Sequence, residues 1–125
     1  MGAGDGKWLG YRNNRMEAML YFKNAVPVKS LTLSTLKNIG GYIFPPASVE
    51  VWGGDDPKRL KLLGTIQPEQ PKKDGPAGII PYDINFKEVS VKYLKVIAVP
   101  VPKLPKWHGG KGDKGWVFVD EILVN

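Results

Sequence analysis

Apolar and polar residues alternate along much of the chain, with a repeat of two residues. Between residues 15 and 22, for example, Ala18, Leu20 and Phe22 fall on one side of the alternation. Side chains that repeat in this way lie on one face of a β-strand. No stretch keeps a 3.6-residue apolar repeat for three turns, so the pattern predicts strands rather than helices.

Turn-forming residues interrupt this alternation at short intervals. The chain has 11 prolines and 15 glycines, and the segments between them are rich in Val, Ile, Leu, Tyr and Phe, which favours short strands joined by turns. The predicted strands are residues 15–22, 28–36, 48–52, 60–66, 79–86, 89–99 and 116–124. Residues 67–78 are expected to form an exposed loop. Roughly seven or eight antiparallel strands are typical of an all-β, jelly-roll β-sandwich.

The alternation also predicts which side chains face the interior. Leu31 and Leu33 are expected on one face of their strand. Val49 and Val51 are expected to point inward, and Trp52, the residue after Val51, is expected on the outer face. Phe44, in a segment between two strands, is expected to plug the core. In the closing strand we expect two uninterrupted faces: Val117, Val119, Glu121 and Leu123 on one, and Trp116, Phe118, Asp120 and Ile122 on the other.

The length of 125 residues corresponds to one ordinary domain, which we expect to span residues 1–125. The first five residues lack the apolar segment of a signal peptide. We therefore interpret the start as a cut inside a longer polypeptide. No apolar run approaches the ~20 residues needed to cross a bilayer, so membrane insertion is not expected.

The net charge of +6 raises the question of an acidic partner. The lysines are scattered, however, with only Lys72 and Lys73 adjacent, and the chain has no basic helix or arginine cluster. We interpret these charges as a solvated surface and predict no nucleic-acid partner. A binder of nucleic acid or of anionic glycans would instead gather its lysines on one face and bind with steep salt dependence.

Catalytic motifs are missing from the sequence. The chain has one histidine, His108, and no cysteine, and no Gly-x-Ser-x-Gly nucleophile elbow accompanies that histidine. One histidine with scattered carboxylates makes a poor zinc site. The glycine-rich residues 109–112 precede a strand instead of a helix, which does not fit a phosphate-binding loop. We predict no catalytic residues and a non-enzymatic chain.

The segment from residue 106 to 122 holds the densest chemical signal. It contains Trp107, His108 and Lys111 among several glycines. Aromatic rings stack on the apolar C–H face of a pyranose, nearby polar groups bond its hydroxyls, and glycines let the backbone come close. These three residues are therefore candidates for carbohydrate binding. In the alternative interpretation, Trp107 caps the open end of the sandwich and His108 bonds a backbone carbonyl.

A second aromatic stretch, residues 40–46, links two predicted strands and should lie at an end of the sandwich. Tyr42 in this stretch is expected to meet the Trp107 loop. Trp8, near the start of the chain, is a candidate third wall of the same site, or it packs against the first strand. We count both aromatic residues among the candidate carbohydrate-binding residues.

Six segments of the chain resemble, in their order, discoidin-like (coagulation factor 5/8 type C) domains. They are Asp5–Trp8, Glu17–Phe22, Val28–Leu33, Ile43–Val51, Tyr93–Val96 and Val119–Ile122. The run from Trp107 to Gly112 and on through Trp116–Ile122 is most similar to the version fused behind the catalytic domain of Bacteroidetes β-N-acetylhexosaminidases (chitobiases). The resemblance covers nearly the whole chain.

This resemblance implies a galactose-binding-like jelly roll at the C-terminal end of an exported glycoside hydrolase, periplasmic or on the cell surface. It also implies a structural calcium ion, with Asp5 and Glu121 at the matching positions, since hard cations take oxygen ligands. The N-terminal loop here lacks the family's usual Asp-Gly-Asp-x-x-Thr run. A salt bridge or hydrogen bond that ties the chain ends together is the other explanation for Glu121.

Two functions remain open at this point. In the first, the chain is a non-catalytic accessory domain that binds a glycan, which requires its aromatic candidates to converge with an open ring face. In the second, it is a structural module that docks on the parent's own catalytic domain and stabilises it. The second function requires those aromatic residues to be buried and an apolar patch to lie elsewhere on the surface.

Overall fold

The computed structural model describes residues 9–11, 15–41, 43–73, 75–110, 112 and 115–125. These residues form six strands and one short 3-10 helix. The strands are β1 (Leu9–Tyr11), β2 (Met16–Lys37), β3 (Ser48–Gly54), β4 (Lys61–Ile66), β5 (Gly78–Val99) and β6 (Val117–Val124), and the helix is η1 (Ile39–Gly41). Within these residues, the structure has no helix of the length and apolarity needed to cross a membrane.

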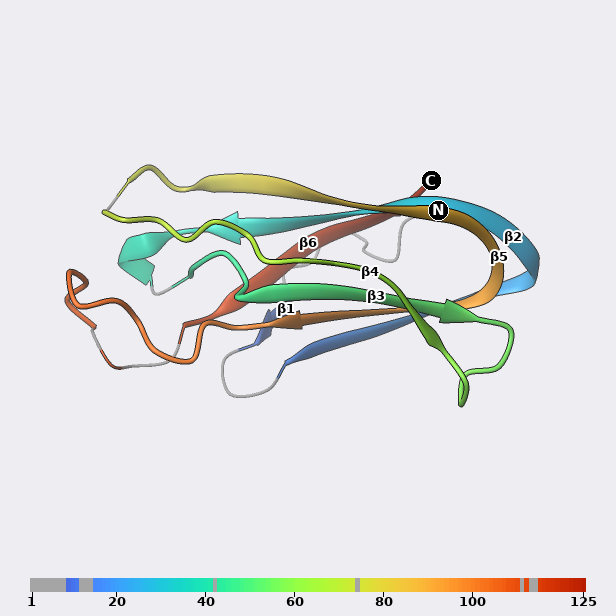
Figure 1. Ribbon diagram of the computed structural model, residues 1–125. Coiled ribbons are helices and arrows are strands. Elements are labelled where there is room, and N and C mark those ends of the chain that lie inside the picture. The colour runs from blue at the N-terminus through green and yellow to red at the C-terminus, as the bar shows by residue number, and fades with distance from the viewer. Residues whose placement is uncertain (1–8, 12–14, 42, 74, 111, 113–114) are drawn as a thin grey trace.

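The six strands form one antiparallel sheet in the order β1-β6-β2-β5-β3-β4. This sheet folds over on itself at the bends of β2 and β5, which produces two facing layers (Figure 1). One layer contains β1, β6 and the halves of β2 and β5 that pair around Leu31 and Ile84. The other contains β3, β4 and the remaining halves of β2 and β5. The predicted all-β sandwich is confirmed.

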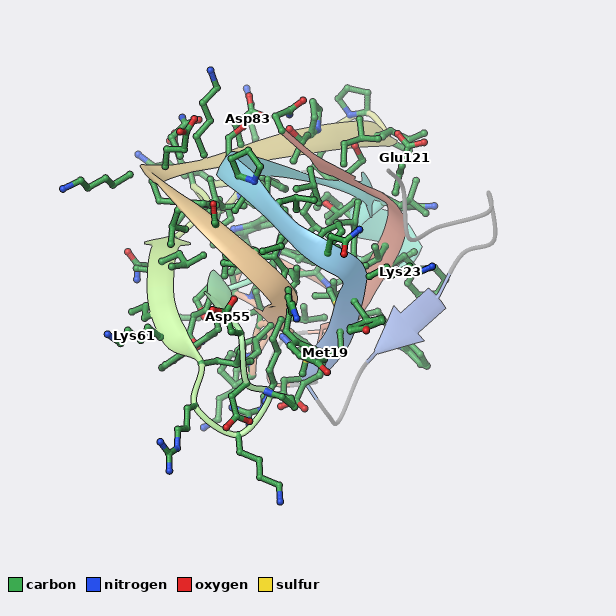
Figure 2. All side chains as sticks on the ribbon, turned by 90° about the vertical axis from the view of Figure 1, so that its right-hand side faces the viewer. Met19, Lys23, Asp55, Lys61, Asp83 and Glu121 are labelled. Carbon is green, nitrogen blue, oxygen red and sulfur yellow. The ribbon has the colours of Figure 1, made fainter. Side chains whose placement is uncertain are left out.

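Figure 2 views the molecule from the bend, where β2 and β5 pass from one layer to the other. Asp83 and Glu121 lie on one layer, and Met19 and Lys61 lie on the other. The connecting segments lie at the end of the sandwich opposite the bend. They are residues 38–46, 67–73 and 100–110 (Figure 1). We call this opposite end the loop end.

The long bent strands correct the predicted strand boundaries. Predicted strands 15–22 and 28–36 are two halves of β2, and strands 79–86 and 89–99 are two halves of β5. The β2–β5 pairing shifts register between Tyr21 and Val26 and again between Val28 and Ser30. Such irregularities increase the local twist and bend a strand without ending it. The polar stretch before Pro27 is therefore a bend rather than a loop.

The core lies between the two layers and follows the predicted alternation in most strands. Leu31, Leu33, Val49, Val51 and Leu94 are fully buried. Their cluster extends through both layers, and burial of each large aliphatic side chain contributes about 1.5–3 kcal/mol to the free energy of folding. The predictions for the interior faces of β2 and β3 are confirmed.

The alternation predicted for the closing strand is wrong after Val119. Val117 and Val119 are buried, which makes their side the inward one, but Ile122 of the other side is also buried, while Glu121 and Leu123 are exposed. The β2–β6 register shifts between Ser34 and Thr35, opposite the step from Val119 to Glu121. The extra residue in β6 is a β-bulge, which exchanges the inward and outward sets of side chains beyond it.

Candidate carbohydrate-binding site

The predicted aromatic segments meet at the loop end. The Phe44 backbone N–H donates to the Trp116 carbonyl at 3.3 Å, and Ile43 forms a parallel bridge with Trp116. Asn38 and Ile43 bond each other through both backbone groups at 2.9 Å. The segment that follows η1 is thereby fixed beside the start of β6, next to the Trp107 loop.

A small apolar cluster separate from the main core holds this end together. Ile39, Phe44 and Leu104 are buried against one another, and Val101 packs beside them. Phe44 is only 1% exposed, so the prediction that it plugs the interior is confirmed. The cluster joins η1, the segment after it and the 100–110 segment, which together form a rigid base for the residues above it.

Trp107 lies on this base with much of its indole open to solvent. The side chain is 39% exposed. Its ring centroid is 6.1 Å from that of Phe44, at an interplanar angle of 36°, and 5.8 Å from that of His108, at 68°. These separations are typical of stabilising aromatic pairs. The indole is therefore packed against two aromatic neighbours while the residue remains partly exposed.

His108 is buried beneath Trp107, and both of its ring nitrogens bond to the backbone. The Gly110 N–H donates to Nδ1 at 2.9 Å, and Nε2 lies 2.6 Å from the Ile39 carbonyl oxygen. Because Nδ1 accepts a bond, Nε2 carries the proton and donates to Ile39, which fixes the neutral tautomer. The ring also meets Phe44 edge-on at 5.4 Å. His108 thus ties the Trp107 loop to η1, which is one of the two roles predicted for it.

Several candidate residues lie outside the part of the chain that the structure describes: Trp8, Tyr42, Lys111 and Asp5. Their predicted roles stay predictions. Tyr42 precedes Ile43 and Lys111 follows Gly110, and both of these neighbours lie at the loop end. The backbone around them is therefore in the region where the sequence placed the site.

The predicted calcium site also remains a prediction. Glu121 is exposed on β6, where its backbone pairs with Ser34, and Asp5 is not among the described residues. No group of three or more His, Asp or Glu side chains able to hold a metal occurs among the residues that are described. Glu121 alone does not supply the six to eight oxygen ligands that calcium takes.

The structure reveals a second hollow at the loop end that the sequence analysis missed. This cavity of about 570 Å³ is lined by Lys37, Pro45, Glu69, Gln70, Pro71, Lys72, Lys73, Gly75, Ile80 and Tyr82. We call it the Lys37 cavity. It opens between the early half of β5 and the segment after β4, so the predicted exposed loop forms one of its walls. The adjacent Lys72 and Lys73 were the only sequence signal for it.

Two side chains shape the walls of the Lys37 cavity. The Gln70 amide donates to the carbonyls of Pro45 at 3.0 Å and Pro46 at 3.1 Å, which attaches the 67–73 segment to the segment after η1. On the opposite wall, burial raises the pKa of the Tyr82 hydroxyl. The Thr35 side chain partly opposes this shift, although the Thr35 hydroxyl does not reach hydrogen-bond geometry with any described group.

The layer that contains β3 and β4 presents a partly apolar outer face. Cross-strand pairing puts Met19, Lys95, Trp52 and Leu62 in one row on this face. Met19 is 47% exposed and Leu62 47%. Trp52 is half-buried there, as predicted, and its Nε1 donates to Glu50 at 3.1 Å. We refer to this surface as the outer face.

Comparison with solved structures identifies the fold. The CBM32 module of AlyQ in complex with 4,5-unsaturated mannuronic acid matches 98% of this chain and 81% of its own, at 11% identity and a TM-score of 0.60. The C-terminal domain of a chitobiase from Bacteroides fragilis matches 97% of this chain and 75% of its own, at 15% identity and a TM-score of 0.56. Both likenesses establish the fold, and both agree with the resemblance found in the sequence.

Comparisons of the sequence itself give a different result. No model of a known protein family matches the chain, and no curated protein matches it either. At identities of 11% and 15%, a shared fold does not by itself carry over a ligand or an activity. The function of this chain must therefore be argued from its own site.

Proposed function

We propose that the chain is a non-catalytic accessory domain that binds carbohydrate at its loop end. The observation that carries this proposal is the Trp107 indole, 39% exposed and held from behind by Phe44 and His108. Large aromatic side chains are usually well buried. This one stays partly open beside its aromatic neighbours, and a pyranose ring offers it a face of apolar C–H groups.

In this proposal the residues of the site have different tasks. Trp107 stacks on the sugar. His108 holds the Trp107 loop on η1 through its two backbone bonds, so it positions the indole and does not contact the ligand. Lys111, Tyr42 and Trp8 remain candidates for bonds to the hydroxyls and for the further walls of the site. A shallow site of this kind binds few sugar atoms, so affinity in the millimolar to micromolar range is expected.

We further propose that the parent protein is an exported glycoside hydrolase of the β-N-acetylhexosaminidase type. Support comes from the sequence resemblance and from the chitobiase C-terminal domain among the structural neighbours. The AlyQ module was solved in complex with a sugar, which supports glycan binding by this fold. The domain would then bring the parent's catalytic domain to its polymeric substrate, and the predicted Asp5–Glu121 calcium would stabilise the chain start.

A glycan array tests this function directly. The wild-type chain should bind at least one class of glycan, and Trp107→Ala should weaken that binding by roughly tenfold or more. Trp52→Ala is the matched control, because it removes the same side chain from the outer face instead of the loop end. If no glycan binds, or if both variants lose binding equally, the proposal is wrong.

A second candidate function rests on the outer face. Met19 and Leu62 are exposed there, and Tyr21, two residues along β2 from Met19, is 58% exposed and packs its ring 5.1 Å from that of Tyr93. Such exposed apolar side chains in a row are typical of an interaction surface. The domain would then dock on the parent's catalytic domain. Binding of the separate catalytic domain that Met19→Asp abolishes and Trp107→Ala preserves would favour this function.

A further inference from the structure

The Lys37 cavity combines features that point to a ligand of a particular class. We propose that it is a second binding site, distinct from Trp107, for a carboxylated sugar residue of the uronic-acid type. Lys37, Lys72 and Lys73 attract the carboxylate, and the uncharged walls accept the sugar ring. The proposal rests on the proposed function only in that the ligand is a sugar, since it uses other residues.

The size and position of the cavity suit one monosaccharide. Its volume of about 570 Å³ lies within the range of small-molecule sites. Ile80 and Tyr82 form one wall, from the inward face of β5, and Pro45 and Pro71 come from the segments across from it. These side chains are largely apolar and stiff, so they offer the C–H face of a sugar ring a surface that loses little entropy on binding.

The charges around the cavity are unbalanced. The described lining residues include three lysines and one glutamate, Glu69, and so carry a formal charge of +2; Asp74, between Lys73 and Gly75 in the sequence, lies outside the described residues. Among the described residues, ion pairs join Arg15 and Lys95 to Glu17 and Arg59 to Asp56, whereas Lys37, Lys72 and Lys73 have none. A concave surface with one sign of charge concentrates ions of the opposite sign.

The lining by itself accommodates either a carboxylate or a phosphate, because lysine binds both as a point charge, and the titration with phosphate below separates the two. Phosphate sites commonly use the forked guanidinium of arginine or a helix N-terminus, and neither lines this cavity. Lysine supplies a compact charge with three donors, which suffices for a carboxylate. The remaining sugar hydroxyls need both donors and acceptors, and the hydroxyl of the lining residue Tyr82 offers both.

Gln70 is the second polar group that favours a ligand with hydroxyls. Its NH₂ group faces two proline carbonyls, which can only accept hydrogen bonds, so the orientation of the amide is fixed. Its Oε1 is consequently directed away from them and is buried with no partner among the described residues. A buried acceptor of this kind calls for a water or ligand donor.

Amide chemical-shift mapping of the intact, ¹⁵N-labelled chain tests the proposal. The chain is titrated with glucuronate, glucose and inorganic phosphate at one ionic strength. Glucuronate should shift residues that line the Lys37 cavity, and glucose should shift them far less. Lys37→Gln should weaken glucuronate binding roughly tenfold, whereas Lys87→Gln, an exposed lysine of β5 outside the cavity, should leave it unchanged.

A second pair of variants separates the cavity from general charge effects. Lys72→Glu places a carboxylate at the cavity and should abolish glucuronate binding, while Lys87→Glu makes the same charge reversal at an exposed position of β5 outside the cavity and should not. Trp107→Ala should leave glucuronate binding intact. Equal shifts with phosphate would reduce the site to non-specific anion attraction and overturn the proposal. Shifts confined to the Trp107 loop would overturn it while leaving the proposed function standing.

Discussion

One imidazole ring links two segments far apart in the sequence. His108 bonds the Ile39 carbonyl through Nε2 and accepts from Gly110 through Nδ1, while its ring edge packs on Phe44. Together these contacts fix the position of the neighbouring Trp107. At the residue scale, the position of Trp107 therefore depends on a buried polar side chain. An apolar side chain of the same size would make neither of its hydrogen bonds.

Replacement of His108 by alanine should destabilise the fold and also impair the site. The change removes two hydrogen bonds and leaves the Ile39 carbonyl and the Gly110 N–H without partners, which costs about 2–4 kcal/mol. Urea denaturation measures the loss, with the exposed Lys106→Ala as control. A loss of sugar binding with unchanged stability would mean instead that His108 contacts the ligand.

The Tyr82 hydroxyl gives the fold a defined response to alkaline pH. Burial raises the pKa of Tyr82 above its usual value of 10.0. Its contribution to stability is complete below that pH. As the pH rises above about 10, the unfolded state ionises first, so the free energy of unfolding falls until the pKa of the folded state is passed. Urea titrations between pH 8 and 11 should therefore show a smaller decline for Tyr82→Phe than for wild type. Equal declines would contradict this assignment.

The elements of the fold differ in how far the sequence predicts them. Local alternation located every strand from β2 to β6, because one face of each is buried against the other layer. It did not reveal that β2 and β5 continue through their bends, since this continuity depends on pairing between segments distant in the chain. The bulge in β6 was hidden for the same reason: it is visible only opposite Ser34 and Thr35.

The two candidate sites differ in the same way. The Trp107 loop could be found from the sequence because its aromatic residues and glycines are adjacent. The Lys37 cavity could not, because its walls come from β2, the 67–73 segment and β5. Only folding brings Lys37, Gln70 and Tyr82 to one place. In the sequence, Lys37 is one of many scattered lysines, and Tyr82 lies within a predicted strand.

The packing of β3 against its surroundings makes a further prediction at the scale of the element. A Cβ atom added at Gly53 would lie 2.7 Å from Leu63 Cδ1 and 3.0 Å from Leu94 Cδ2. Gly53→Val should therefore cost about 1–3 kcal/mol through overpacking. Gly78→Val is the control, because no atom lies within 4 Å of the Cβ position there. Thermal unfolding distinguishes the two, and equal midpoints would mean that the β3 region adapts freely.

At the scale of the whole molecule, one folded sheet produces two kinds of surface. The loop end carries Trp107 and the Lys37 cavity, and the outer face carries the exposed Met19 and Leu62. The bend of β2 and β5 keeps the far end of the sandwich closed (Figure 1). In the proposed functions, the loop end binds the glycan and the outer face rests on a neighbouring domain.

The calcium prediction also belongs to the whole molecule, because it concerns how the chain start is attached. If Asp5 and Glu121 share a calcium ion, removal of calcium with EGTA should lower the unfolding temperature of the wild type. Glu121→Gln should lower it as well and abolish the effect of EGTA. An unfolding temperature independent of calcium in the wild type would leave the salt-bridge explanation for Glu121.

The central claim is that the open indole of Trp107 contacts sugar. The indole N–H resonances of the intact, ¹⁵N-labelled chain report on its four tryptophans separately. During titration with N,N′-diacetylchitobiose and with a panel of other oligosaccharides, the Trp107 signal should shift and saturate for at least one ligand, while the Trp52 signal stays in place. A Trp107 signal that does not move with any sugar in the panel would contradict the account.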